Sequence, residues 1–257
     1  MSLSQREAAT LRRPSPIFLA ILAVFAGCGL LLWYGVGPVG LAAFGFVLGG
    51  WLVSLCLHEY AHAATAYHSG DHSVLDKGYL TLNPLKYSHV LLSIVLPLVF
   101  VVLGGIGLPG GAVYINPHAL RSKVRESLVS AAGPLTNVGF AIALALGIGW
   151  AVSGADTHLT FWAATAYLCM LQVMASLLNL LPVPGLDGYG IAEPWLPDEW
   201  VSTARKVAPF GLLIVFAFLW EPRIGGAFFG AVFWILELVG VPSPLVWAGS
   251  DLFRFWS

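Results

Sequence analysis

The chain has 257 residues, of which 58% are hydrophobic and 10% charged, and its formal net charge is −1. A soluble domain carries about 25% charged residues, so this composition excludes a soluble globular protein and indicates an integral membrane protein. The near-neutral charge offers no basic surface for nucleic acid, and three cysteines without a CxxC pair predict small buried residues instead of a disulfide framework.

Apolar runs predict an all-α polytopic membrane protein of about six transmembrane helices, with residues 1–257 forming a single domain. The runs long enough to span a bilayer cover residues 17–36, 39–68, 128–152 and 159–181. Two shorter runs, 210–220 and 224–239, predict either one last span or a helical hairpin over about residues 208–240.

Residues 90–108 are apolar but rich in proline and glycine, which are poor material for a straight helix. If this segment crossed the membrane, the loop with Arg121, Lys123 and Arg125 would lie outside, against the positive-inside rule. A re-entrant segment between the second span and the span at 128–152 removes the conflict. A short β-strand at residues 112–116, "AVYIN", is expected to follow it.

The stretch H-E-Y-A-H places His58, Glu59 and His62 inside an apolar span. Charged groups there cost about 2.5–3.5 kcal/mol each on insertion scales, which favours a function over chance. Two histidines four residues apart share one helix face and can bind one Zn²⁺. Glu59 lies beside that face without having to bind the metal, which is where a general base is needed.

A catalytic zinc needs a third protein ligand and an open position. Asp187 is the favoured candidate, because it follows the inward span that ends at Leu181, and the prolines and glycine between them break the helix. A broken helix end can turn a carboxylate back toward the bundle. The alternative is an aspartate in an ordinary turn, since Asp-Gly is a common turn pair.

Three sequence blocks, taken together and in this order, resemble the site-2 protease family of intramembrane zinc metalloproteases. They are His58-Glu59-x-x-His62, Gly133-Pro134-Leu135-Thr136-Asn137 and Asn179-x-x-Pro182-x-x-x-x-Asp187-Gly188. The linking text, "GYLTLNPLKY" and "VYINPHAL", is similar to a compact prokaryotic branch without PDZ or CBS domains. The resemblance covers about residues 39–190, which would form the catalytic core.

The resemblance implies that one Zn²⁺ per chain is held by His58, His62 and Asp187. It implies that Glu59 activates the water and that Asn179 positions the substrate carbonyl or steadies the oxyanion.

A structural role is expected for the block Gly133, Pro134 and Asn137, which would let spans pack closely and join them by hydrogen bonds.

The resulting prediction is a zinc endopeptidase that cleaves a membrane protein within or near its transmembrane segment, in a prokaryotic cell membrane. The substrate would unwind and pair with Val113, Tyr114 and Ile115 by strand addition. Arg12 and Arg13 place the N-terminus in the cytoplasm, and the active site would face the same side. The partners would be the lipid bilayer and a substrate with a transmembrane helix. Two alternatives stay open: a metal or proton-coupled transporter, and a proteolytically silent zinc-binding protein. The sequence specifies neither the substrate nor the oligomeric state.

Overall fold

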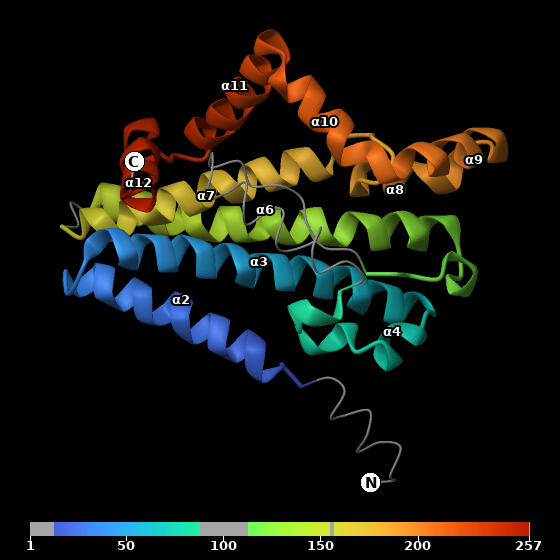
Figure 1. The fold of residues 1–257 in the computed structure, drawn as a ribbon, viewed down its shortest axis with the longest axis horizontal. Helices are drawn as coiled ribbons and strands as arrows, with labels where there is room; N and C mark the ends of the chain where they lie inside the picture. The colour runs from blue at the N-terminus through green and yellow to red at the C-terminus, as the bar shows by residue number, and fades with distance from the viewer. Residues whose placement is uncertain (1–12, 88–112, 155–156, 257) are drawn as a thin grey trace, which may run out of the picture.

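The computed structural model of this chain describes residues 13–87, 113–154 and 157–256, and the regular structure in those ranges is helical throughout (Figure 1). The segments long and apolar enough to cross a bilayer are α2 (Pro16–Tyr34), α3 (Val39–Ser69), α6 (Lys123–Ser153), α7 (Leu159–Asn179) and the stretch Asp198–Trp220. A pair bent by 115° makes a sixth span if it is counted as one: α11 (Pro222–Leu238) and α12 (Ser243–Phe253). The expected all-helical membrane protein is confirmed, with five or six candidate spans.

Short helices connect these spans. Between α3 and α6, the described residues form α4 (Ser73–Asp76), η1 (Tyr79–Thr81), η2 (Pro84–Lys86) and η4 (Pro117–Ala119). After α7 the short connecting helices are α8 (Asp187–Ala192) and η5 (Glu193–Trp195). The candidate span Asp198–Trp220 consists of α9 (Asp198–Val207), η6 (Ala208–Phe210) and α10 (Gly211–Trp220).

Local sequence chemistry sets the helix ends. The Ser15 side chain accepts the N–H of Phe18 at the start of α2, and Gly35 closes that helix with a φ of 66°. Ser122 caps α6 in the same way by accepting the N–H of Arg125. Because of this cap, α6 begins several residues before the apolar run from which the span was predicted, and its first turns are polar.

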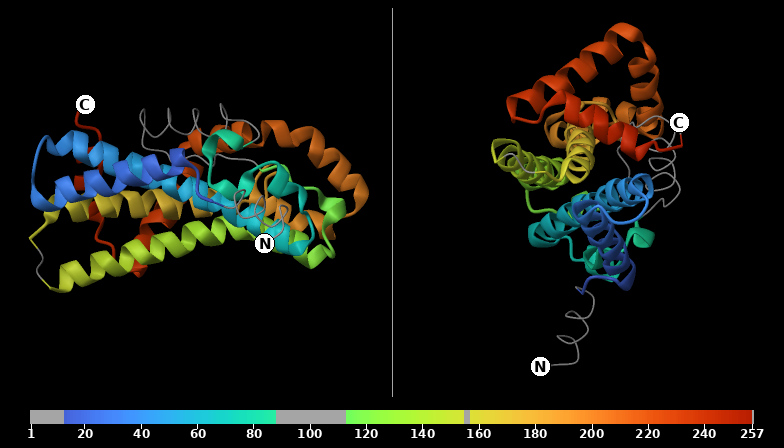
Figure 2. Two further views of the ribbon diagram at one scale, coloured as in Figure 1. Left: turned by 90° about the horizontal axis from the view of Figure 1, so that it is seen from below. Right: turned by 90° about the vertical axis from the view of Figure 1, so that its left-hand side faces the viewer.

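Helix α7 lies at the centre of the bundle. In its membrane-spanning window 89% of the residues are buried, against 61% in α3 and 17% in α2. Helices α3, α6 and α7 run side by side along the long axis, and α2 packs on the outside of α3 (Figures 1 and 2). The helices that surround α7 therefore enclose the part of the molecule best shielded from lipid.

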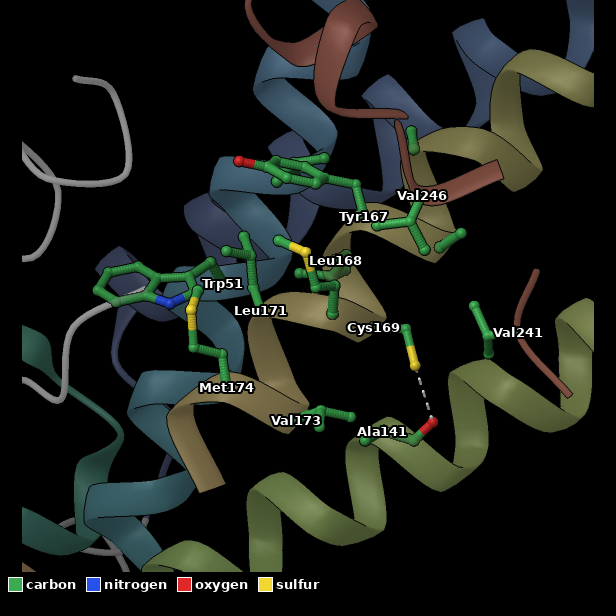
Figure 3. Packing of buried hydrophobic residues seen from close by; sticks show 14 of the residues in the cluster. Trp51, Ala141, Tyr167, Leu168, Cys169, Leu171, Val173, Met174, Val241 and Val246 are labelled. Atoms are coloured by element: carbon green, nitrogen blue, oxygen red, sulfur yellow. Dashed lines mark hydrogen bonds between the residues drawn. The ribbon is translucent and has the colours of Figure 1, made fainter. Parts of the chain in front are cut away.

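Small residues allow these helices to approach closely. Gly50 of α3 leaves room for Leu168 of α7, whose Cδ2 would lie 2.5 Å from an added Cβ. Cys169 donates from Sγ to the carbonyl of Ala141 on α6 at 3.4 Å, within a cluster of apolar side chains (Figure 3). The cysteine is free and buried, as its sequence setting predicted.

Helices α10 and α11 meet at Glu221 and form a V that points away from the bundle (Figure 1). Residues 208–240 thus contain η6 and, over most of their length, the two helices α10 and α11, which are separated by a break at Glu221. Only 11% of the window in the stretch Asp198–Trp220 is buried. Helix α12 was not predicted from the sequence. It packs across α7, where Gly249 lies against the carbonyl of Ala163.

The predicted strand at residues 112–116 needs correction. Residues 113–116 have no regular secondary structure and no strand partner within the described ranges, although the backbone of Asn116 is extended. A strand requires a backbone partner along its length. Residue 112 and the predicted re-entrant segment, 90–108, lie outside the described residues.

Candidate metal centre

Two helices that are distant in sequence bring three ligand groups together. His58 and His62 come from the C-terminal half of α3, and Asp187 is the first residue of α8. The two Nε2 atoms are 3.0 Å apart. One carboxylate oxygen of Asp187 lies 3.2 Å from His58 Nε2, and the other lies 3.3 Å from His62 Nε2. This is the only group of three metal-ligating side chains found within the described residues.

The spacing of these atoms suits a tetrahedral ion. Bonds of about 2.0–2.1 Å to nitrogen or oxygen place neighbouring ligand atoms about 3.4 Å apart around zinc. The observed separations of 3.0, 3.2 and 3.3 Å are close to that edge length. Two imidazoles and one carboxylate leave a fourth position open, as a hydrolytic site requires.

The outer nitrogens of both imidazoles are held by α6. His62 Nδ1 donates to the carbonyl oxygen of Val129 at 2.7 Å, and His58 Nδ1 donates to Asn137 Oδ1 at 3.2 Å. Because both oxygens are acceptors, each Nδ1 carries a proton, and a neutral ring then keeps its Nε2 lone pair directed at the site. The rings are therefore in the tautomer and orientation that metal binding needs.

Gly133 lies opposite the ligand set, between Val129 and Asn137 on the same face of α6. A Cβ atom at this position would collide with His62 Nε2 and would lie 2.5 Å from His58 Nε2. Those separations are near the length of a zinc–nitrogen bond, so a methyl group would occupy the space in which an ion fits. The residues present therefore fit a bound zinc, and the glycine is part of that fit.

The break after α7 brings Asp187 back to the histidines. Pro182 and Pro184 prevent the helix from continuing after α7, and Gly185 adopts a φ of 96°. Gly188 lies against the carbonyls of Leu180 and Leu181, where a larger residue would clash. The short helix α8 can therefore fold directly onto the end of α7.

Helix α8 is also fixed to α6. The Ser127 hydroxyl donates to the carbonyl of Ile191 at 2.7 Å and accepts the indole N–H of Trp195 at 2.9 Å. Gly190 packs against Ser130, whose Oγ would be 2.7 Å from an added Cβ. Helix α6 thus holds all three ligands, two through imidazole hydrogen bonds and one through α8.

Glu59 is almost completely buried beside the ligands. Its side chain is 2% exposed, and Oε1 lies 4.0 Å from His58 Nε2. The backbone N–H of Val113 donates to this carboxylate, while Oε2 has no partner in the part of the chain that the structure describes. The carboxylate is near the ligand set without belonging to it, and one of its oxygens is unpaired among the described residues.

The extended segment 113–116 lies along this end of α3. Lys77 donates from Nζ to the carbonyl of Tyr114 at 2.8 Å, and its ammonium lies 4.7 Å from the Tyr114 ring centre. Asp71 accepts the N–H of Asn116 at 2.8 Å. Val113 and Ile115 pack inward while Tyr114 is 67% exposed, so the segment alternates as a strand does.

Not every predicted residue joins this constellation. Asn179 is buried at the last position of α7. Within the described residues, no hydrogen bond connects its side chain to the three ligand groups. Neither the carbonyl of Val129 as an acceptor nor the space that Gly133 leaves for an ion was predicted, although close packing at Gly133 was. A usable signal was present, since Val129, Gly133 and Asn137 are spaced by four residues and share one helix face.

Sequence comparison finds bacterial relatives over nearly the whole chain. A Mycolicibacterium smegmatis protein, "Putative zinc metalloprotease Rip2", is 48% identical over 95% of both chains. Its Mycobacterium tuberculosis namesake is 47% identical over 98% of this chain and 97% of its own. The Bacillus subtilis "Putative zinc metalloprotease YwhC" is 30% identical over 68% of this chain and 79% of its own.

No family model matches the chain, and no solved structure matches it.

Proposed function

Because this chain belongs to the site-2 protease family of zinc metalloproteases, we propose that it hydrolyses a peptide bond within or near the transmembrane segment of a membrane-protein substrate. The observation that carries the proposal is the convergence of His58, His62 and Asp187 on a space that Gly133 keeps open. The transporter and silent-binder alternatives are set aside, since the relatives are zinc metalloproteases.

His58, His62 and Asp187 would hold the zinc. When bound, zinc lowers the pKa of a water molecule and polarises a carbonyl as a Lewis acid.

The chain's own residues complete the reaction. Glu59 takes a proton from the attacking water at Oε2 and later returns it to the amine that leaves. The N–H of Val113 holds the carboxylate in place during this transfer. Asn137 and the carbonyl of Val129 keep both imidazoles in the binding tautomer.

Asn179 is proposed to bind the substrate carbonyl or its developing negative charge. Its support is its position at the end of α7, directly before the break that leads to Asp187. This role requires the carboxamide to turn toward the substrate when one is bound.

The extended segment 113–115 is proposed to receive the substrate. It lies beside Glu59, it has the alternation of a strand, and its inward side chains are already packed. A helical substrate must unwind to expose its scissile bond, and an unwound segment can add to an extended backbone by strand pairing.

The orientation of the bundle is proposed from the basic residues. Lys77, Lys86 and Arg125 all lie at the metal-centre end of the helices, which the positive-inside rule assigns to the cytoplasm. Ser15, just before α2, donates its N–H to the carbonyl of Thr81 at the same end, so the N-terminal arginines would be cytoplasmic as well.

The decisive experiment separates chemistry from metal binding. Glu59→Gln should keep one zinc per chain while cleavage falls by about 10²- to 10⁴-fold, the range for loss of a general base. Cleavage is read by comparing membrane proteomes of cells that express the wild type or the variant. Fragments cut within transmembrane segments should appear with the wild type alone.

Asp187→Ala tests the ligand set in the same cells. It should lower zinc content, whereas Asp251→Ala, which removes a carboxylate that is 80% exposed on α12, should not. Full cleavage by Glu59→Gln, or unchanged zinc content in Asp187→Ala, would contradict the proposed roles.

A further inference from the structure

The connection after α3 carries two opposite charges that bind the backbone of the segment before η4. Asp71 is 2% exposed, and one of its oxygens accepts both the N–H and the hydroxyl of Ser73, at 3.1 and 2.7 Å. Its other oxygen accepts the N–H of Asn116 at 2.8 Å. Lys77, which follows α4, donates from Nζ to the carbonyl of Tyr114 at 2.8 Å. Asp71 and Lys77 therefore form a clamp on one backbone donor and one backbone acceptor.

Both charged groups of the clamp belong to one compact turn. The N–H of Lys77 donates to the carbonyl of Ser73 at 3.1 Å, and Ser73 in turn donates twice to Asp71. The Lys77 ammonium also lies 4.7 Å from the ring centre of Tyr114 and 5.9 Å from that of Tyr79, which are distances for cation–π attraction. Two rings and a carbonyl thus hold the ammonium, which distinguishes it from a free surface lysine.

The clamped segment depends on such contacts for its position. It has no regular secondary structure and no strand partner within the described ranges. Its backbone is instead bound by the side chains of Asp71, Lys77 and Glu59. Val113 and Ile115 add apolar packing, but apolar packing is non-directional. The direction of the Val113 N–H therefore depends on the clamp that holds the backbone after it.

The Val113 N–H is the group that holds the proposed general base. It donates to the Glu59 carboxylate, and because Oε2 has no partner in the described part of the chain, the accepting atom is Oε1. A hydrogen bond to one carboxylate oxygen orients the other, which is the oxygen assigned to the attacking water. A shift of this segment would turn the carboxylate without moving the imidazoles, since α6 holds those.

We propose that Lys77 is a positioning residue for Glu59. Its ammonium and the Asp71 carboxylate fix the backbone that follows Val113, and this sets the Val113 N–H against Oε1 of the base. Lys77 acts through the backbone and does not touch the reacting atoms. This role rests on the proposed function, because it concerns the base of that reaction.

Amide exchange tests the clamp without any substrate. The full-length zinc-loaded protein is compared with Lys77→Met, which keeps an unbranched apolar stem but lacks the ammonium. The protection factor of the Val113 amide should fall about tenfold in this variant, the lower end of what a hydrogen bond from a charged group contributes. Lys77→Arg restores a charged donor and should recover the protection. Lys86→Met, which removes an exposed ammonium from η2, should leave it unchanged.

Fragment formation tests the connection to the base. In the comparison of membrane proteomes, Lys77→Met should yield roughly tenfold less of each wild-type fragment, within the 10²-fold that a misplacement of about 1 Å can cost. Zinc content should stay at one per chain, because α6 holds the ligands. Lys77→Arg should recover cleavage. A merely structural role for Lys77 predicts a parallel loss of zinc and no selective rescue by arginine.

Two results would overturn the proposal. The first is wild-type protection of the Val113 amide in Lys77→Met. The second is unchanged or increased fragment formation in a Lys77→Met protein that has lost this protection, which would show that the clamp does not serve the base. Absence of fragments with the wild type would contradict the proposed proteolysis instead, and exchange alone would then decide whether Lys77 positions the Val113 N–H.

Discussion

The metal centre and the V of α10 and α11 use similar residues under opposite packing conditions. In α7, 89% of the spanning window is buried, whereas in the stretch Asp198–Trp220 the share is 11%. Gly133 lies against two imidazoles, but Gly226 and Gly230 of α11 have no atom within 4 Å of an added Cβ. Because lipid is as apolar as leucine, hydrophobicity alone does not distinguish these helices. The difference lies in what each residue contacts.

The largest predicted effect comes from replacing one glycine by alanine in each of the two regions, Gly133 at the metal centre and Gly230 in the V. Gly133→Ala should nearly abolish zinc binding, well beyond the 10- to 100-fold loss typical of an outer partner, because the methyl fills the metal's space. Gly230→Ala should leave affinity unchanged and favour the helix by about 0.8–1.0 kcal/mol. Titration with a competing chelator measures both. Wild-type affinity in Gly133→Ala would remove the distinction between the two regions.

A leucine pair tests the same contrast through stability. Leu171 of α7 is fully buried and Leu213 of α10 is 64% exposed. Leu171→Ala should lower the free energy of unfolding by about 2–5 kcal/mol, because it leaves a cavity and loses contacts. Leu213→Ala should change it by about 0.5 kcal/mol or less. Denaturation in mixed micelles gives the values, and equal losses would show that the V packs as firmly as the core.

The hydrogen bond between Asn137 and His58 allows a smaller effect on zinc affinity to be tested within the metal centre. Asn137→Ala should weaken zinc binding by about 10- to 100-fold, since His58 loses the acceptor that fixes its tautomer. Asn137→Asp retains an oxygen acceptor and should recover most of the affinity. A purely structural role for Asn137 predicts no such recovery, so chelator competition on the two variants decides between them.

The smallest effect is expected at the tether between Asp71 and Asn116. Burial acts to raise the pKa of Asp71, but the N–H of Asn116 and the donors of Ser73 outweigh it and lower the pKa below its usual value. A lowered pKa means that the stabilisation is complete above the unfolded value of about 3.9 and is lost as pH falls through the folded value. The protection factor of the Asn116 amide, which is its exchange rate relative to the unfolded chain at the same pH, should therefore fall in acid below about pH 4.

A matched pair of variants checks this tether. Asp71→Asn should speed up exchange at Asn116 already at neutral pH, whereas Asp76→Asn, on the exposed side of α4, should not. Acid sensitivity that persists in Asp71→Asn would attribute the effect to another group.

The sequence predicted the metal ligands better than the groups of α6 that hold those ligands in place. His58, Glu59 and His62 follow from spacing on one helix, and the geometry confirms that His58, His62 and Asp187 form a group able to bind one metal. Close packing at Gly133 was predicted, but the space that this glycine leaves for an ion was not, because it arises from the distance between two helices and not from either sequence. The carbonyl of Val129 is a backbone group, so its residue type carries no signal, and only its spacing of four residues from Gly133 indicated it.

The peripheral elements were less predictable for a related reason. Helix boundaries followed apolar runs and caps, as in α2 and α7. The V at Glu221 and the helix α12 depend on how short segments pack against α7, and each run alone was compatible with one span or two. Residues 113–116 had the composition of a strand, but composition cannot provide the partner that a strand requires.

The break after α7 has a consequence for biosynthesis. His62 and Asp187 are 125 residues apart, and a ribosome that adds about 5–20 residues per second needs roughly 6–25 s to make that interval. During this time the nascent chain has two of its three ligands and no helix α8. The enzyme therefore cannot complete its zinc site, or cleave other proteins near the translocon, until most of its spans have been inserted.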